Sequence, residues 1–382
     1  MIRTISGARV VTDGRILSNV DVRVEDGRIL DVLPRSARAE NRVMLDGLYL
    51  APGFIDLHVH GGDGYEFIDA TEEAFSKACA VHAKGGTRVI YPTISAADAE
   101  TTWRALETAE RALGSLDAEA PGVHLEGPYL SPEMRGAQDA VYIRRPDPAE
   151  YLPILERFAP IIARWSYAPE TDDGLFLQAL NRYSVKAAAA HTAAEYAHIL
   201  PAYENGCRLV THLYSGTSTV TRHGGFRRLG VIESAYLLDG MDVEAIADGC
   251  HIPAELMRLI VKIKTPAHTA LITDAIRYAG MKDIENACGG TERIPYIIED
   301  GVAKLADRSA FAGSIATTEQ LLKRTVQAGV SLADTVRMMT ETPARIMGLT
   351  RKGRVAPGYD ACFTVFDESL NVQPNDILEC LD

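Results

Sequence analysis

The sequence has no closely spaced pair of cysteines, no long basic run and no apolar stretch long enough to cross a membrane. Its six cysteines lie far apart and form no C-x-x-C pair, so neither a thiolate metal site nor a disulfide framework is expected. The formal charge of −13 argues against non-specific binding to nucleic acid or to an anionic membrane. No apolar run approaches the ~20 residues that span a bilayer, and no signal peptide precedes the first strand pattern. We therefore expect a cytoplasmic protein that acts on a small molecule.

The two ends of the chain share one pattern, in which short strands alternate apolar and polar residues around turns. V-D-V-R-V-E-D-G-R-I-L-D-V has this pattern near the start, and G-R-V-A-P-G-Y-D-A-C-F-T-V-F-D resumes it near the end. The pattern predicts a small β-sandwich domain built from both termini, residues 1–50 plus 350–382. Two unrelated appendages are the alternative.

The middle of the chain, residues 51–349, alternates short apolar strands with helical stretches. Eight strand-like segments recur: residues 54–60, T-R-V-I-Y-P-T, P-G-V-H-L-E-G-P, V-K-A-A-A-A-H-T, C-R-L-V-T-H-L-Y, V-E-A-I-A-D-G, T-A-L-I-T-D-A and S-A-F-A-G-S. This number of units predicts an α/β fold of the (β/α)₈ TIM-like barrel type. An open doubly wound sheet is the alternative, but it normally carries a Gly-rich phosphate loop, and none is present.

Several of these strands end in a polar residue that a purely structural strand does not need. The set consists of His58, His60, Glu126, His191, His212 and Asp274. In a barrel these ends meet at the carboxyl-terminal mouth, where active sites of this fold lie. Alternation places the imidazoles of His58 and His60 on the same face.

Imidazoles combined with carboxylates make a site for a divalent cation, with Zn²⁺ or Fe²⁺ best suited. His124 shares the face of Glu126 and is expected to support a ligand rather than to be one. His82, His198 and His268 fall in helices or loops and are expected to be ordinary structural histidines.

At these residues the sequence resembles the amidohydrolase superfamily and, within it, the N-acetylglucosamine-6-phosphate deacetylases. The matching motifs are P-G-F-I-D-L-H-V-H-G-G, H-L-E-G-P-Y-L-S-P, H-T, T-H-L-Y, A-D-G-C-H, T-D-A and A-G-S, in this order along the chain.

The resemblance implies a role for each of these residues. Glu126, His191 and His212 would hold the principal metal ion, while His58 and His60 would complete a second site that some members lack. Asp274 would be the catalytic carboxylate, with metal contact as a second duty, and His251 would contact the substrate.

The physical chemistry agrees with these roles. A bound cation lowers the pKa of its water to around 7, which supplies hydroxide at neutral pH. Asp274 can accept the proton of that water and then donate it to the leaving amine.

The chain departs from the family pattern on the substrate side. Ser215, followed by Gly216, replaces the Asn that helps to hold the sugar, and Gln138 stands where many members carry His. The position of the phosphate-gripping arginine is occupied by His223, although Arg222, Arg227 and Arg228 are close by. These residues could still bind a phosphate, or they could serve another anion, a subunit contact or a surface loop.

The expected function is hydrolysis of the N-acetyl amide of N-acetylglucosamine 6-phosphate or a closely related amino-sugar phosphate. The alternatives are an amidohydrolase for another N-acyl or cyclic amide and a non-catalytic relative. Because the phosphate-gripping arginine of this family can come from the neighbouring subunit, the resemblance also implies a homodimer.

Overall fold

The structure is a computed structural model that describes residues 2–36, 41–374 and 377. Residues 1, 37–40, 375–376 and 378–382 of the predicted terminal domain therefore lie outside the described part of the chain. Within the described part, no helix is both long enough and apolar enough to cross a membrane.

The amino-terminal segment and one carboxyl-terminal strand fold into two four-stranded sheets, with strand orders β5-β4-β1-β6 and β24-β7-β2-β3. Val22, Val24 and Leu50 lie in the apolar core that these sheets share. The strands are β1 (Arg3–Ser6), β2 (Arg9–Thr12), β3 (Arg15–Leu17), β4 (Val20–Glu25), β5 (Arg28–Pro34), β6 (Arg42–Met44), β7 (Tyr49–Pro52) and β24 (Phe363–Phe366).

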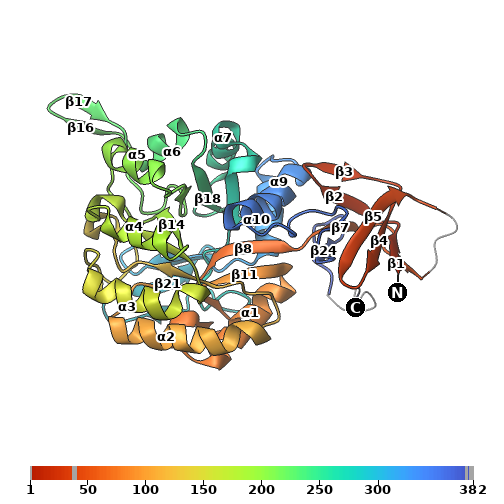
Figure 1. The fold of residues 1–382 in the computed structure, drawn as a ribbon, viewed down its shortest axis with the longest axis horizontal. Coiled ribbons are helices and arrows are strands. Elements are labelled where there is room, and N and C mark those ends of the chain that lie inside the picture. The colour runs from red at the N-terminus through yellow and green to blue at the C-terminus, as the bar shows by residue number, and fades with distance from the viewer. Residues whose placement is uncertain (1, 37–40, 375–376, 378–382) are drawn as a thin grey trace.

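The two ends of the chain meet in this sandwich. β24, from the carboxyl-terminal end, pairs antiparallel with β7, which leads directly into the first barrel strand. The predicted β-sandwich from both termini is confirmed, and it lies beside the barrel (Figure 1). The domain boundaries at residues 50 and 350 stay a prediction.

The middle of the chain forms the predicted (β/α)₈ barrel. Eight strands lie in the order β19-β18-β15-β14-β13-β12-β11-β8, and every pairing between them is parallel. A parallel bridge between Val59 and Ala275 joins the two ends of the row. The strands are β8 (Phe54–Val59), β11 (Thr87–Ile94), β12 (Val123–Glu126), β13 (Ile162–Tyr167), β14 (Lys186–Ala189), β15 (Leu209–Val210), β18 (Asp242–Ile246) and β19 (Thr269–Ile272).

One barrel strand was not predicted, and one predicted segment belongs elsewhere. β13, with the sequence I-A-R-W-S-Y, was missed because Arg164 and Ser166 interrupt its apolar character, yet both side chains are buried inside the barrel. The segment S-A-F-A-G-S instead contributes β23 (Phe311–Gly313) to a separate antiparallel sheet, and a bridge from Ser314 to Ala275 ties it to the barrel.

Ten α-helices lie in the described part of the chain, most of them around the barrel. In α2, Asp98 accepts a hydrogen bond from the backbone N–H of Thr101, which satisfies a free donor of the first turn. The same helix buries Ala105, Leu106 and Ala109 against the barrel. The helices are α1 (Glu72–Lys84), α2 (Ala99–Ala112), α3 (Pro148–Phe158), α4 (Leu175–Arg182), α5 (Tyr196–Glu204), α6 (Val231–Leu237), α7 (Ala254–Lys264), α8 (Thr318–Gln327), α9 (Leu332–Met339) and α10 (Glu341–Met347).

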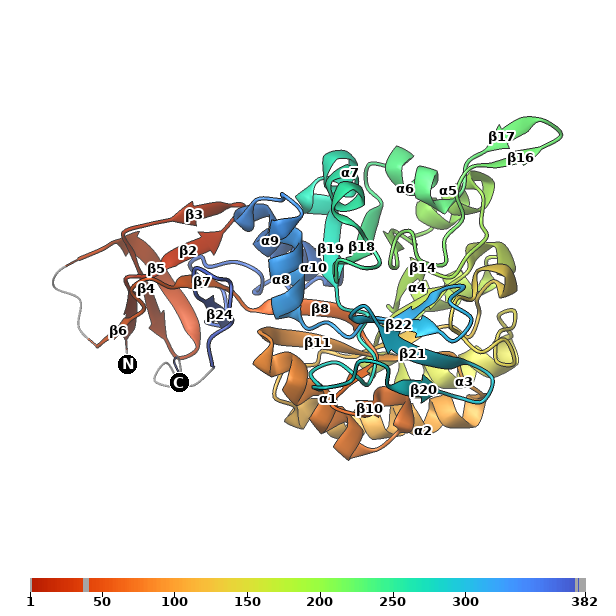
Figure 2. The same cartoon turned by 180° about the vertical axis from the view of Figure 1, so that it is seen from behind.

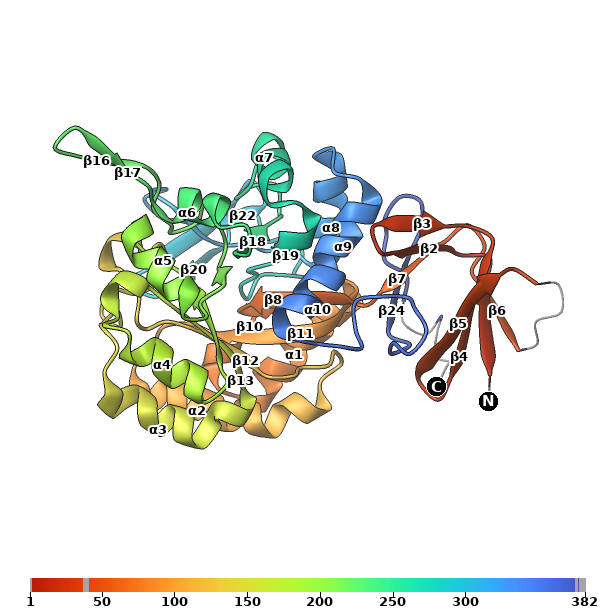
Figure 3. The same ribbon diagram turned by 45° about the horizontal axis from the view of Figure 1, so that its top comes forward.

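Two further β elements extend from the barrel. The antiparallel sheet β20 (Cys288–Gly290), β21 (Pro295–Glu299), β22 (Val302–Leu305) and β23 follows the last barrel strand (Figure 2). The hairpin β16 (Thr221–His223) and β17 (Phe226–Arg228) projects away from the body of the molecule (Figure 3).

Candidate metal and catalytic site

The six predicted site residues come from the carboxyl ends of five barrel strands. His58 lies in β8 with His60 just after it, Glu126 ends β12, and His191, His212 and Asp274 follow β14, β15 and β19. The structure brings all six side chains together at one mouth of the barrel. As alternation predicted, the imidazoles of His58 and His60 point to the same place, with their Nε2 atoms 3.1 Å apart.

Glu126 lies at the centre of this group. Its Oε1 is 2.8 Å from Nε2 of His212, 3.3 Å from Nε2 of His191 and 3.5 Å from Nε2 of His58. Its Oε2 is 3.2 Å from Nε2 of His60. Four imidazoles therefore present the same nitrogen to a single buried carboxylate.

Asp274 closes the group on the side of the first strand. Its Oδ1 lies 3.2 Å from Nε2 of His60 and 3.4 Å from Nε2 of His58. In two groups of three residues the ligand atoms all lie within 4.8 Å of one another, close enough to hold one metal ion. One group is His58, His60 and Asp274, and the other is His58, Glu126 and His212.

Three of the six residues have a positive φ angle, a left-handed backbone conformation that residues other than glycine rarely adopt. The φ angle is +43° at His191, +32° at His212 and +48° at Asp274. Each such conformation costs on the order of 1–3 kcal/mol and persists where the surroundings enforce it. Here the chain turns sharply as it leaves the strand, and the side chain stays at the mouth of the barrel.

Hydrogen bonds at Nδ1 orient three of the four imidazoles. His191 and His212 lie 2.9 Å and 3.0 Å from the carbonyl oxygens of Met134 and Ser215. A carbonyl can only accept, so each Nδ1 carries the proton and Nε2 offers its lone pair to the centre. Nδ1 of His60 lies 2.9 Å from Oγ of Ser95. This set of oriented nitrogens and carboxylate oxygens fits a divalent cation.

The charges of the group are strongly coupled. Burial lowers the pKa of His58 and of His60, but Asp274 and Glu126 outweigh it and raise the values to about 9 and about 10. Burial raises the pKa of Glu126, but the imidazoles around it hold that pKa well below its usual range. Protons thus bind where a cation would bind, so metal binding at this site would release protons.

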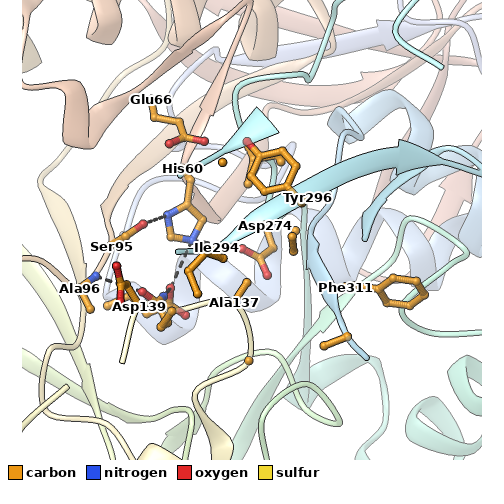
Figure 4. Close-up of a pocket in the computed structure, with 18 of the residues that line it drawn as sticks. His60, Glu66, Ser95, Ala96, Ala137, Asp139, Asp274, Ile294, Tyr296 and Phe311 are labelled. Carbon is orange, nitrogen blue, oxygen red and sulfur yellow. Dashed lines mark hydrogen bonds and ion pairs between the residues drawn. The ribbon is translucent and has the colours of Figure 1, made fainter. Parts of the chain in front are cut away.

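A pocket of about 810 Å³ opens over the group, and His60, Glu126, His191, His212 and Asp274 line its floor. Figure 4 shows His60 and Asp274 together, with Tyr296 and Phe311 of the antiparallel sheet on one side. A cavity of this size accommodates a molecule as large as a sugar phosphate.

A sequence model of the amidohydrolase family matches residues 49–379 of the chain. The N-acetylglucosamine-6-phosphate deacetylase of Lysinibacillus sphaericus is 30% identical over 364 residues, which cover 92% of this chain and 90% of the relative. The chain belongs to the amidohydrolase family.

Two solved structures support the same assignment. N-acetylglucosamine-6-phosphate deacetylase from Pasteurella multocida superposes with a TM-score of 0.90 at 26% identity, covering 97% of each chain. A mutant deacetylase from Mycobacterium smegmatis in complex with N-acetyl-D-glucosamine-6-phosphate gives a TM-score of 0.88 at 28% identity, covering 97% of this chain and 96% of that one. As an amidohydrolase, the protein is a metal-dependent hydrolase of carbon–nitrogen bonds.

Four of the seven residues predicted on the substrate side of this amidohydrolase line the pocket: Gln138, Ser215, Gly216 and His251. Gln138 donates a hydrogen bond of 2.7 Å to Oε2 of Glu126, so its side chain contacts one of the predicted metal ligands. Gly216 has no room for a side chain, because a Cβ would lie 2.7 Å from Nδ1 of His191. Nδ1 of His251 lies 2.7 Å from Oδ2 of Asp248, which orients its ring.

The other three predicted residues, Arg222, His223 and Arg227, do not line the pocket. They lie on the β16–β17 hairpin, whose residues are exposed, and Phe226 at its tip is 79% exposed. Within one chain the structure therefore separates the hairpin from the predicted site.

Sequence reasoning missed several residues that surround the site. Arg277, Arg293 and Tyr296 line the pocket, and the latter two come from the antiparallel sheet region that was not predicted. Arg164 and Glu244 form a buried ion pair behind His58. A charged residue within an otherwise apolar strand was the signal that could have identified this pair.

Proposed function

We propose that this amidohydrolase hydrolyses the N-acetyl amide of N-acetylglucosamine 6-phosphate, or of a closely related amino-sugar phosphate, to acetate and the free amine. The observation that carries the proposal is the meeting of four imidazole nitrogens with Glu126 and Asp274 at the floor of a sugar-sized pocket. The relatives with this activity match more than nine-tenths of the chain.

Glu126, His191 and His212 hold the principal cation in this proposal, and His58 and His60 hold a second one, with Asp274 as a further contact. Imidazole and carboxylate donors suit Zn²⁺ or Fe²⁺. A bound divalent cation supplies Lewis acidity, which makes a water acidic and polarises the amide carbonyl.

Asp274 performs the proton transfers. Its carboxylate lies beside the two imidazoles of the first strand, and burial is outweighed there by His58 and His60, which hold the pKa of Asp274 well below its usual range. In its ionised form it can take a proton from water and pass it to the leaving nitrogen. An amide nitrogen is a poor leaving group until it is protonated, so this second transfer is as important as the first.

His251 is proposed to contact the substrate. Nδ1 of His251 is paired with Asp248, the ring lies 4.7 Å from the ring of Phe311, and the residue lines the pocket, which leaves Nε2 for the substrate in this proposal. From that position the lone pair of Nε2 can accept a hydrogen bond from a sugar hydroxyl.

The phosphate is proposed to be bound by the hairpin of a neighbouring subunit. Arg222, His223 and Arg227 are exposed on an arm that projects from the body, and none of them lines the pocket of its own chain. An arm of this kind fits a homodimer in which each subunit completes the other's pocket. The expected cytoplasmic location stays a prediction.

A second candidate is hydrolysis of a different N-acyl or cyclic amide. Ser215 favours it, because it stands where the resemblance implies the Asn that helps to hold the sugar, and Gln138 stands where many members of that family carry His. Retention of all six cluster residues argues against a non-catalytic relative.

Acetate release from N-acetyl hexosamines and from their 6-phosphates, measured on protein of known metal content, distinguishes these candidates. We expect turnover chiefly of the phosphorylated sugars, and Arg222→Ala, His223→Ala or Arg227→Ala should raise KM for them alone. Arg228→Ala is the matched control, because the guanidinium of Arg228 is already hydrogen-bonded to Glu195 at 2.9 Å, whereas Nε2 of His223 lies 3.7 Å from the other oxygen of that carboxylate. Equal turnover of both sugar forms, or a metal-loaded protein that releases no acetate, contradicts the proposed substrate.

A further inference from the structure

A layer of buried polar side chains crosses the barrel beneath the six predicted metal-site residues. Arg164 of β13 forms an ion pair with Glu244 of β18, and both side chains are essentially inaccessible, at 1% and 0% exposed. Two strands, β14 and β15, separate β13 from β18 in the sheet, so this pair spans the barrel interior. Arg164 also donates to the carbonyl oxygen of Leu57 at 3.0 Å and lies 2.9 Å from Nδ1 of His124.

The second oxygen of Glu244 faces the one imidazole of the cluster whose Nδ1 has no partner. Nδ1 of His58 and Oε2 of Glu244 are 3.7 Å apart, which is longer than a hydrogen bond, and within the described residues neither atom has another partner. A buried donor or acceptor without a partner costs about 1–3 kcal/mol. An approach of several tenths of an ångström would satisfy both atoms at once.

His58 differs from the other three imidazoles in the kind of group it meets at Nδ1. His60 meets a hydroxyl, and His191 and His212 meet backbone carbonyls, all of them neutral. Only His58 among the four faces a carboxylate there. A carboxylate that accepts the Nδ1 proton leaves the lone pair on Nε2 and makes that nitrogen a stronger donor.

We propose that Glu244, held by Arg164, is the positioning residue of His58 and sets how tightly the cation on the His58–His60 side is bound. The inference rests on the cation site of the proposed function. Arg164 fixes one oxygen of Glu244 and balances its charge, which leaves the other oxygen for His58. Nε2 of His58 then points towards Glu126 and Asp274, where the cation would lie.

The test is Glu244→Gln, measured by titrating chelator-treated protein with Co²⁺ while following stoichiometry and visible absorption. Gln has a single acceptor oxygen, so either Arg164 or His58 loses its partner. We expect binding on the His58–His60 side to weaken by ~10- to 100-fold, with an altered Co²⁺ spectrum. Asp242→Asn is the matched control, because Asp242 lies on the same strand and pairs instead with Arg345 and His268. The control should bind Co²⁺ with wild-type affinity.

A double variant keeps the proposal testable if Glu244→Gln does not fold. Replacing both members of a buried ion pair with apolar groups of similar size is often neutral for stability. Arg164→Met combined with Glu244→Leu should therefore fold and still show the weakened Co²⁺ binding. Wild-type affinity and an unchanged spectrum in a folded variant overturn the inference, as does a wild-type protein that binds no divalent ion. A wild-type protein that binds Co²⁺ but releases no acetate overturns only the proposed substrate, because the Co²⁺ measurement does not depend on turnover.

Discussion

His82 is expected to make part of the protein's stability depend on pH, and replacing this one residue should abolish that part. It lies in α1, is fully buried, and donates from Nε2 to the carbonyl oxygen of Gly61 at 2.9 Å, next to the metal cluster. Burial lowers its pKa from 6.5 to about 4, and the Gly61 carbonyl opposes this only in part. The imidazole is therefore neutral in the folded protein at pH values where it is protonated in the unfolded chain.

The sign and the size of the effect follow from this difference. Because the pKa of His82 is lower in the folded state, the stabilisation is complete above pH 6.5 and is lost as the pH falls towards 4. Between pH 8 and pH 5 the loss from this residue is about 2 kcal/mol, and it approaches about 3 kcal/mol at lower pH.

The measurement is urea unfolding of metal-free wild-type protein and of His82→Gln at pH 8, 7, 6 and 5. Fluorescence of the two tryptophans, Trp103 and Trp165, reports on the barrel. The substitution itself changes the free energy of unfolding by an amount that does not depend on pH, and the difference between the two proteins at pH 8 measures it. Between pH 8 and pH 5 the free energy of unfolding of His82→Gln should fall by about 2 kcal/mol less than that of the wild type. If both proteins lose stability equally over this range, the reasoning about His82 is wrong.

Two further predictions concern turnover. Asp274→Asn should lower kcat by ~10²- to 10⁴-fold while metal content is kept, and full turnover with metal bound would refute the proton-transfer role. Mixing equal amounts of Arg227→Ala and Asp274→Asn subunits should restore about a quarter of wild-type activity on the phosphorylated sugar, because each mixed dimer then has one intact site. No recovery on mixing would show that the hairpin does not act on the neighbouring subunit.

The cluster residues could be identified from the sequence because each lies at or just after the end of a barrel strand. Local alternation places His58 and His60 on one face, and the barrel then brings distant strand ends to one mouth. Neither step needs knowledge of long-range side-chain packing.

The walls of the pocket could not be predicted in the same way. Tyr296 and Phe311 come from an antiparallel sheet that follows the barrel strands, and nothing in its short strands indicates which surface it covers. The Arg164–Glu244 pair depends on which strands face each other across the barrel, and that follows only from the closed sheet.

The charge balance of the pocket bears on whether one chain can bind a phosphate by itself. Among the described residues, the arginines that line the pocket are Arg277 and Arg293. Arg277 lies 3.0 Å from Glu66 and 3.3 Å from Asp69, and Arg293 lies 2.6 Å from Asp139.

Both guanidinium groups are therefore already paired with carboxylates, and a phosphate could reach either one only by displacing its partner. The hairpin, in contrast, carries Arg222 and Arg227 on an exposed arm whose tip presents Phe226 to solvent. Among the described residues, both arginines that line the pocket are thus paired with carboxylates, and the arginines of the arm do not line that pocket. The proposed dimer would bring such an arginine to a phosphorylated substrate, whereas a protein that works as a monomer would favour an uncharged amide.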